Sequence, residues 1–148
     1  MVTVEEVEVL LVEDNSSDAE LTVRALKKNN LTNRLQIARD GVEALDFLFA
    51  RGAFANRAGS QLPKVVLLDM KLPKMSGLEV LAAIRKDERT RVLPVVMLTS
   101  SKQEPDIQRC YALGVNSYIV KPVDFEAFAH AVTQAGLYWL LVNQPPTT

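Results

Sequence analysis

A doubly wound α/β fold, in which helices cover both faces of a parallel β-sheet, is predicted by the order of the apolar segments. Strand-length segments rich in β-branched residues alternate with helix-length segments whose apolar residues recur every three or four positions. Residues 65–68 are apolar without interruption, as in a strand buried on both faces, and Asp69 follows them directly. No internal repeat divides the pattern, so we expect one sheet with right-handed crossovers.

Length and composition are those of one compact domain. The chain has 148 residues, 48% of them hydrophobic, enough to bury roughly two thirds of the unfolded surface. Its net charge of −1 and the lack of a basic run argue against direct binding to nucleic acid or an anionic membrane. The single cysteine, Cys110, cannot close an intramolecular disulfide. With neither a signal peptide nor a membrane-length apolar run, we expect a cytoplasmic protein.

The first strand is expected at residues 7–12, which are apolar and often β-branched. Glu13 and Asp14 close it, and capping residue types at 15–17 begin a helix. This helix runs to about residue 28, where cations and asparagines are typical of a helix end.

A second strand and a second helix come next. Residues 34–38 form the strand, and Asp40 and Gly41 turn the chain into the helix. Its apolar residues are expected to share one face: Val42, Leu45, Leu48 and Phe49. Residues 51–63, with two glycines and a proline, form the longest irregular segment, which is too short to hold a domain boundary.

The central strand is expected at residues 64–68 and brings Asp69 to its carboxyl end. Ser76 and Gly77 lead into a third helix at 78–86. Residues 92–98 form a fourth strand, again apolar on both faces.

The fourth strand ends at Thr99, and a helix at 104–113 follows, stopped by Gly114. A fifth strand at 116–120 ends at Lys121. Asp124 then caps a long last helix, whose apolar residues keep helical spacing: Phe125, Phe128, Val132, Ala135 and Trp139.

Five strands alternating with five helices fit the flavodoxin-like (βα)5 arrangement, with strand order 2-1-3-4-5. Residues 1–148 are expected to form a single domain with its core at about 7–142. The ends, about 1–5 and 143–148, are expected to fray.

Polar side chains gather where the strands end, at the edge of the sheet at which ligands bind in open α/β folds. They are Glu13, Asp14, Asp69, Thr99 and Lys121. Three carboxylates this close repel one another unless a cation is present, and Mg²⁺ prefers oxygen ligands. A hydroxyl and an ammonium beside them suit a transferred phosphoryl group.

Five short motifs along the chain carry a family resemblance. They are Leu-Val-Glu-Asp-Asn at 11–15, Leu-Leu-Asp at 67–69, Leu-Pro-Lys-Met-Ser-Gly at 72–77, Leu-Thr-Ser at 98–100 and Tyr-Ile-Val-Lys-Pro at 118–122. Together they resemble the receiver domain of two-component response regulators, across residues 7–141. Ala-Leu-Asp-Phe-Leu at 44–48 and the Trp139-Leu140 ending are most similar to single-domain regulators that serve phytochrome-type histidine kinases.

The resemblance implies that Asp69 is the phosphoacceptor, which takes a phosphoryl group from the phosphohistidine of a histidine kinase. It implies a Mg²⁺ site formed by Glu13, Asp14, Asp69 and the backbone carbonyl of Lys71. The family often has a smaller polar residue at position 71. The long Lys71 side chain should leave metal binding intact and affect the lifetime of the phosphoryl group.

Switching is also implied by the resemblance. Thr99 and Lys121 would contact the phosphoryl group, Tyr118 would change rotamer with Thr99, and a cis peptide would precede Pro122. The surface formed by the fourth helix, fifth strand and fifth helix would then be remodelled to bind another protein. The protein would be a slowly self-dephosphorylating switch and not a turnover enzyme.

Residues 137–142 are apolar around the whole helix, more than one core-facing stripe can hide. We therefore expect a two-fold homodimer through the fifth helix and its C-terminal end, strengthened by phosphorylation. Folding of this segment back onto its own domain is the alternative.

Other interpretations of the site stay open at the level of sequence. Asp14 alone fits a helix cap, Lys121 a turn, and Tyr118 simple packing. Cys110 and His130 are assigned to structure, because neither has a companion ligand or base.

A phosphorylation-independent adaptor, an aspartyl-phosphate phosphatase and a flavin carrier are alternative functions. The intact set of acids, hydroxyl and ammonium argues against the adaptor, and Lys71 stands where a phosphatase needs a second acid. No hydroxyl-rich or glycine-rich phosphate loop follows the first strand, which argues against the flavin carrier.

Overall fold

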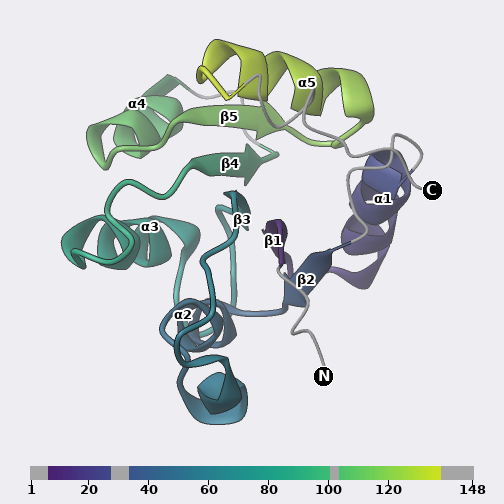
Figure 1. Ribbon diagram of the computed structural model, residues 1–148. Helices are drawn as coiled ribbons and strands as arrows, with labels where there is room; N and C mark the ends of the chain where they lie inside the picture. The colour runs from purple at the N-terminus through teal and green to yellow at the C-terminus, as the bar shows by residue number, and fades with distance from the viewer. Residues whose placement is uncertain (1–6, 28–33, 101–103, 138–148) are drawn as a thin grey trace.

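A single parallel sheet of five strands organises the molecule (Figure 1). The computed structural model describes residues 7–27, 34–100 and 104–137. The strand order is β2-β1-β3-β4-β5, which confirms the predicted flavodoxin-like topology. The strands are β1 (Val9–Val12), β2 (Leu35–Ala38), β3 (Val65–Asp69), β4 (Val95–Thr99) and β5 (Ser117–Val120).

Helices cover both faces of the sheet, with α1 and α5 on one face and α2 and α3 on the other (Figure 1). Their bounds are α1 (Ser16–Lys27), α2 (Gly41–Leu48), α3 (Gly77–Lys86), α4 (Glu104–Ala112) and α5 (Phe125–Gln134), with the short 3₁₀ helix η1 (Gly52–Arg57) after α2. None of the described helices is long and apolar enough to cross a membrane.

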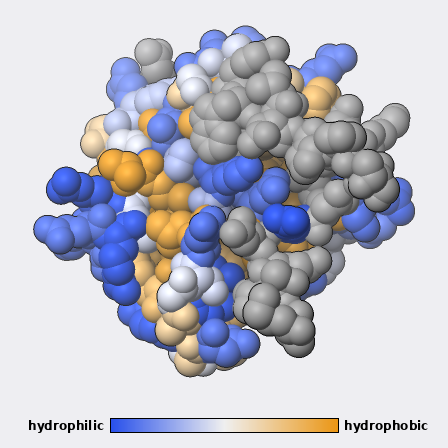
Figure 2. Space-filling model, viewed as in Figure 1, coloured by the Kyte–Doolittle hydropathy of each residue, from blue (hydrophilic) through white to orange (hydrophobic). Residues whose placement is uncertain are grey.

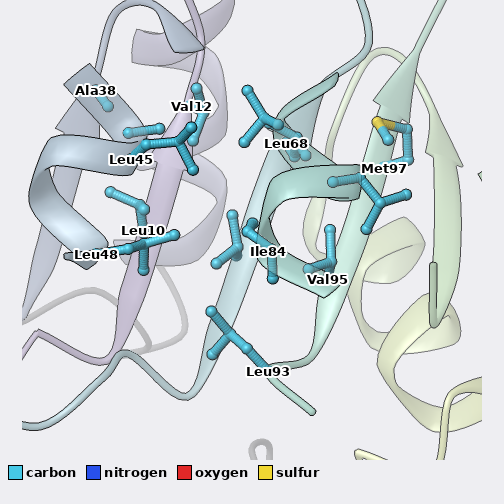
Figure 3. Close-up of a cluster of buried hydrophobic side chains, with 14 of the residues drawn as sticks. Leu10, Val12, Ala38, Leu45, Leu48, Leu68, Ile84, Leu93, Val95 and Met97 are labelled. Atoms are coloured by element: carbon cyan, nitrogen blue, oxygen red, sulfur yellow. The ribbon is translucent and has the colours of Figure 1, made fainter. Parts of the chain in front are cut away.

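Two apolar cores result from this arrangement, because side chains along a strand point alternately to its two faces. On β1, Leu10 packs toward α2 and α3, whereas Leu11 packs toward α1 and α5. Figure 3 shows the first core, in which strand residues such as Val95 and Met97 share one cluster with the helix residue Ile84. All five residues of β3 and of β4 are buried, as predicted for strands covered on both faces.

Polar side chains fix the starts of the helices. Asn15 accepts a hydrogen bond from the amide of Asp18 in the first turn of α1 (2.9 Å). Ser76 and Glu79 form a reciprocal capping box at α3. Asp40 and Asp124 cap α2 and α5 by a single hydrogen bond each, in which one carboxylate oxygen accepts from a backbone amide of the first turn.

Two apolar residues assigned to buried positions lie at the surface. Val42 is 43% exposed, because the buried face of α2 is centred on Ala44, Leu45 and Leu48. Val92 is 83% exposed, since Pro94 separates it from β4, which begins at Val95. The prediction of a strand from residue 92 was therefore wrong.

The segment 51–63 is more regular than expected, because η1 lies within it. Phe54 of η1 meets Phe47 of α2 edge to face, with ring centroids 5.2 Å apart. The guanidinium of Arg57 lies over the Phe47 ring, 3.6 Å from its centroid. An apolar anchor and a cation–π contact thus hold this segment against α2.

The last helix is shorter than predicted. α5 ends at Gln134, and Gly136 takes the left-handed conformation (φ 76°) that favours glycine after a helix. Leu137 then turns back, donates its amide to the carbonyl of Val132 (2.7 Å) and is buried. Residues 138–142, which were predicted to continue this helix and form a dimer contact, lie outside the described residues.

Candidate functional site

The carboxyl ends of the central strands bring the predicted polar residues to one edge of the sheet. Backbone hydrogen bonds continue beyond the strands there: the amide of Glu13 donates to Ala38 and that of Lys121 to Thr99, at 2.9 and 2.8 Å. Because Glu13 and Lys121 directly follow β1 and β5, the sheet fixes their positions. Asp69 itself is the last residue of β3 and is 5% exposed.

Three carboxylates face one another at this edge. Oxygen atoms of Glu13, Asp14 and Asp69 lie within 4.8 Å of one another, and among the described residues no other group of acids, histidines or cysteines is this close. Glu13 and Asp69 are buried, whereas Asp14 is exposed. Oxygen donors of this number and charge fit a hard divalent cation, whose remaining positions water or phosphate oxygens would fill.

Lys121 supplies the positive charge of the site. Its ammonium lies 2.6 Å from a carboxylate oxygen of Glu13 and 2.6 Å from one of Asp69. It also lies 3.2 Å from a carboxylate oxygen of Asp18. The Lys121 side chain is 17% exposed. The peptide bond between Lys121 and Pro122 is cis, as predicted.

The balance of charge explains the ionisation of the site. The pKa of Glu13 is raised to about 7, chiefly by burial and next by its contact with Asp69, while its hydrogen bond to Lys121 acts in the opposite direction. Burial alone would lower the pKa of Lys121, but its hydrogen bonds to Asp69 and Glu13 raise it above the ordinary value. One ammonium therefore does not neutralise the buried carboxylates, and the site favours a further cation.

The loop after Asp69 is held tightly. The amide of Lys71 donates to the Oδ1 atom of Asp69 (3.1 Å), and the amide of Gly77 donates to the carbonyl of Met70 (3.0 Å). A Cβ atom on Gly77 would overlap the carbonyl oxygen of Asp69. The Lys71 side chain is exposed, so its backbone and not its ammonium faces the carboxylate.

Thr99 and Tyr118 lie on neighbouring strands near the site. Thr99 is buried at the end of β4. Tyr118 is half-buried on β5, and its ring meets Tyr111 of α4 edge to face, with centroids 6.2 Å apart. Tyr118 thus connects the sheet to α4. Cys110 is buried, and His130 is exposed on α5.

The sequence analysis did not predict a role at the site for Asp18 or for Gly77. Asp18 was not singled out, although it is an acid in the first turn of the helix that follows Glu13 and Asp14. Gly77 was assigned only to a helix entrance. The described surface beside Lys121 also holds a shallow pocket, lined by Asp18, Leu21, Thr22, Lys121, Pro122 and Val123.

Comparison with known proteins gives consistent relatives. The family model of the response regulator receiver domain matches residues 9–133. The probable methanogenesis regulatory protein FilR2 of Methanothrix harundinacea is 44% identical over 138 residues, which cover 93% of this chain and 86% of that protein. Response regulator Rcp1 of Synechocystis is 38% identical over 132 residues, 89% of this chain and 88% of Rcp1.

Solved structures show the same likeness. The bacteriophytochrome response regulator AtBRR superimposes with a TM-score of 0.84 at 51% identity, over 94% of this chain and 99% of AtBRR. The Mn²⁺-bound form of Rcp1 superimposes with a TM-score of 0.72 at 34% identity, over 95% and 97% of the two chains.

Proposed function

Since the chain belongs to the response regulator receiver domain family, we propose that Asp69 accepts a phosphoryl group from the phosphohistidine of a histidine kinase, in a reaction that requires Mg²⁺. Membership of this family implies interaction with a histidine kinase. The observation that carries the assignment of Asp69 is its carboxylate, which lies 2.6 Å from the ammonium of Lys121 within a group of three acids.

The chemistry follows from the positions of these groups. An oxygen of Asp69 attacks phosphorus, and the new P–O bond forms as the P–N bond to the kinase histidine breaks. The electron pair of the broken bond stays on the imidazole nitrogen, which takes up a proton from solvent water. Lys121 offers its positive charge to a phosphoryl oxygen, and the Thr99 hydroxyl donates to another. The amide of Lys71 holds the second Asp69 oxygen in place during the attack. A bound divalent cation would offset the charge of the acids and the incoming phosphoryl group.

Magnesium is the cation we propose, held by Glu13, Asp14, Asp69 and the backbone carbonyl of Lys71. The group of acids supports a divalent ion, and the Mn²⁺-bound form of Rcp1 shows that a relative takes one. The protein is then a phosphoacceptor with slow autodephosphorylation and not a turnover enzyme. We place it in the cytoplasm, with no direct contact to nucleic acid or membrane, in keeping with its net charge of −1.

The partner we propose is a phytochrome-type kinase, because AtBRR, at 51% identity, is a bacteriophytochrome response regulator. Output would pass through the face formed by α4, β5 and α5. In this face the Tyr118 ring contacts Tyr111, which is 47% exposed, so a rotamer change at Tyr118 would reach the surface. A homodimer through α5 and residues 138–142 would share α5 with this face.

Phosphorylation by acetyl phosphate tests the proposal. With Mg²⁺, the intact mass of the wild type should increase by one phosphate, and Asp69→Asn or added EDTA should prevent the increase. Asp46→Asn serves as the matched control and should label normally. It removes a carboxylate on α2 that is paired with Arg51 and is not part of the group of three acids. Equal labelling of Asp69→Asn and wild type would show that the phosphoacceptor lies elsewhere. A wild type that never labels would favour a phosphorylation-independent adaptor.

A further inference from the structure

Asp18 is the acid of the site to which neither the family motifs nor the proposed chemistry gives a role. It lies in the first turn of α1, and its Oδ2 atom is 3.2 Å from the ammonium of Lys121, a residue 103 positions away. Its side chain is 42% exposed, whereas that of Glu13 is 1% exposed. Asp18 therefore meets Lys121 at the solvent side of the buried carboxylates.

The backbone of Asp18 is held at both of its polar groups. Its amide donates to Oδ1 of Asn15 (2.9 Å), and its carbonyl accepts a hydrogen bond from the hydroxyl of Thr22 (2.9 Å). Thr22 is itself buried. The carboxylate of Asp18 thus extends from a fixed point of the helix, and moving it away from Lys121 would require a change of its own rotamer.

The ammonium of Lys121 has three protons and three carboxylate partners, Glu13, Asp69 and Asp18. Glu13 and Asp69 belong to the group of acids that would hold a divalent cation. In the part of the chain that the structure describes, that group does not include Asp18. Lys121 and a cation therefore compete for the same two carboxylates. Asp18 is the one carboxylate partner of Lys121 that a cation bound at this group would not take.

We propose that Asp18 is a positioning residue, which holds the ammonium of Lys121 aside so that a divalent cation can bind Glu13 and Asp69. This inference rests on the proposed metal-dependent function. The shallow pocket that Asp18 and Lys121 line together leaves space at the surface into which the ammonium can turn. Without Asp18, Lys121 stays on Glu13 and Asp69 and excludes the cation more strongly.

A simpler role for Asp18 must be separated from this one. An acid in the first turn of a helix stabilises the helix, and any negative charge near the site attracts a cation over a distance. Neither effect needs Lys121. The two explanations therefore differ in whether replacing Asp18 still changes cation binding after Lys121 has been removed.

A double-mutant cycle, read by calorimetric titration with MgCl₂ and with MnCl₂, makes this distinction. Asp18→Asn should weaken cation binding about threefold to fivefold, the size expected for a partly exposed ion pair. In a Lys121→Met background the same substitution should change the affinity by less than about 1.5-fold. Asp18→Glu should restore most of the affinity, and Glu20→Gln, on the same helix and paired with Arg24, should bind as the wild type does.

The outcomes separate the inference from the proposed function. A wild type that binds neither cation overturns the proposed function and the inference together. If the wild type binds and Asp18→Asn binds equally, or weakens binding equally in both backgrounds, only the inference is overturned.

If the Lys121→Met protein does not fold, a second measurement tests the inference without it. The ¹⁵Nζ resonance of Lys121 in the Mg²⁺-loaded wild type should shift on Asp18→Asn and return with Asp18→Glu. A resonance that does not respond to Asp18→Asn overturns the inference.

Discussion

Gly77 is the residue whose size matters most to the geometry of the phosphoacceptor loop. It begins α3, its amide hydrogen-bonds the carbonyl of Met70, and a side chain there would meet the backbone of Asp69 and the Cα atom of Met70, 2.8 Å away. Sequence reasoning found Asp69 and Lys121 because each follows an apolar strand. It could not find the demand on Gly77 or the contact of Asp18 with Lys121, since both depend on how α3 and α1 pack beside the sheet.

Gly77→Ala should therefore destabilise the protein, although alanine is the better helix former by about 1 kcal/mol. Overlap with the Asp69 carbonyl should outweigh that gain and lower the free energy of unfolding by roughly 1–3 kcal/mol, measured by urea unfolding. The displaced loop should also slow labelling by acetyl phosphate. Gly59→Ala is the control for labelling, because it also strains the backbone (φ 87°) but its added Cβ meets no atom within 4 Å. A Gly77→Ala protein as stable as the wild type would contradict this account.

At the level of elements, the sequence was sufficient where a local signal determines a boundary. Asp40, Ser76 and Asp124 each begin a helix as their capping chemistry predicts. The sequence was insufficient where a contact depends on how distant segments pack together. Arg85, for example, donates from α3 to the carbonyls of Leu93 (2.7 Å) and Gly114 (2.8 Å), and so links three segments. No periodicity in the sequence indicates such a contact.

The Asp40 cap should give the stability of α2 a dependence on pH. A hydrogen bond from the amide of Glu43 (2.7 Å) lowers the pKa of Asp40, with a smaller contribution from Lys74 that opposes the cost of burial. The folded state then binds the proton less tightly than the unfolded state. The stabilisation is present above the ordinary pKa of 3.8 and is lost as the pH falls through the lower pKa of the folded state.

Asp40→Ala should accordingly cost about 1 kcal/mol near neutral pH, as measured by urea unfolding. The difference from the wild type should shrink as the pH falls below 3.8. Ser76→Ala removes a cap that does not titrate, so its cost should stay constant over the same range. A loss for Asp40→Ala that is the same at every pH would show that the charge of Asp40 is not involved.

At the scale of the whole molecule, the alternation of strands and helices predicted the sheet order, because right-handed crossovers leave few other topologies. The same order brings the site together, since parallel strands end at one edge. The sequence predicted burial of individual apolar residues less well, since Val42 and Val92 are exposed. Figure 2 shows apolar residues surrounded by hydrophilic ones on one face, so hydrophobicity alone does not identify a buried position.

The proposed dimer belongs to this scale. Sedimentation velocity at a concentration on the order of tens of micromolar should show association of the wild type that increases with beryllofluoride, a mimic of the phosphoryl group. Trp139→Ala with Leu141→Glu should weaken it. Val92→Glu places a charge on an apolar residue that is 83% exposed and precedes β4, outside the proposed contact, and should not weaken association. A wild type that is monomeric with and without beryllofluoride excludes the dimer.

Cation binding should stabilise the entire fold, because the three acids come together only when β1 and β3 are paired, through contacts such as Val12 with Leu68. A cation that binds the folded state alone should raise the free energy of unfolding by about 2.7 kcal/mol at a hundredfold excess over its dissociation constant. Thermal unfolding with MgCl₂ should therefore give a higher Tm than unfolding with EDTA.

Asp14→Asn should remove most of this difference, because it takes away one of the three carboxylates. The same substitution should raise the Tm measured in EDTA, since it relieves repulsion among the acids. Glu20→Gln changes the charge by the same amount outside the group and should keep the full response. If Asp14→Asn and wild type respond equally to the cation, the binding site does not include Asp14.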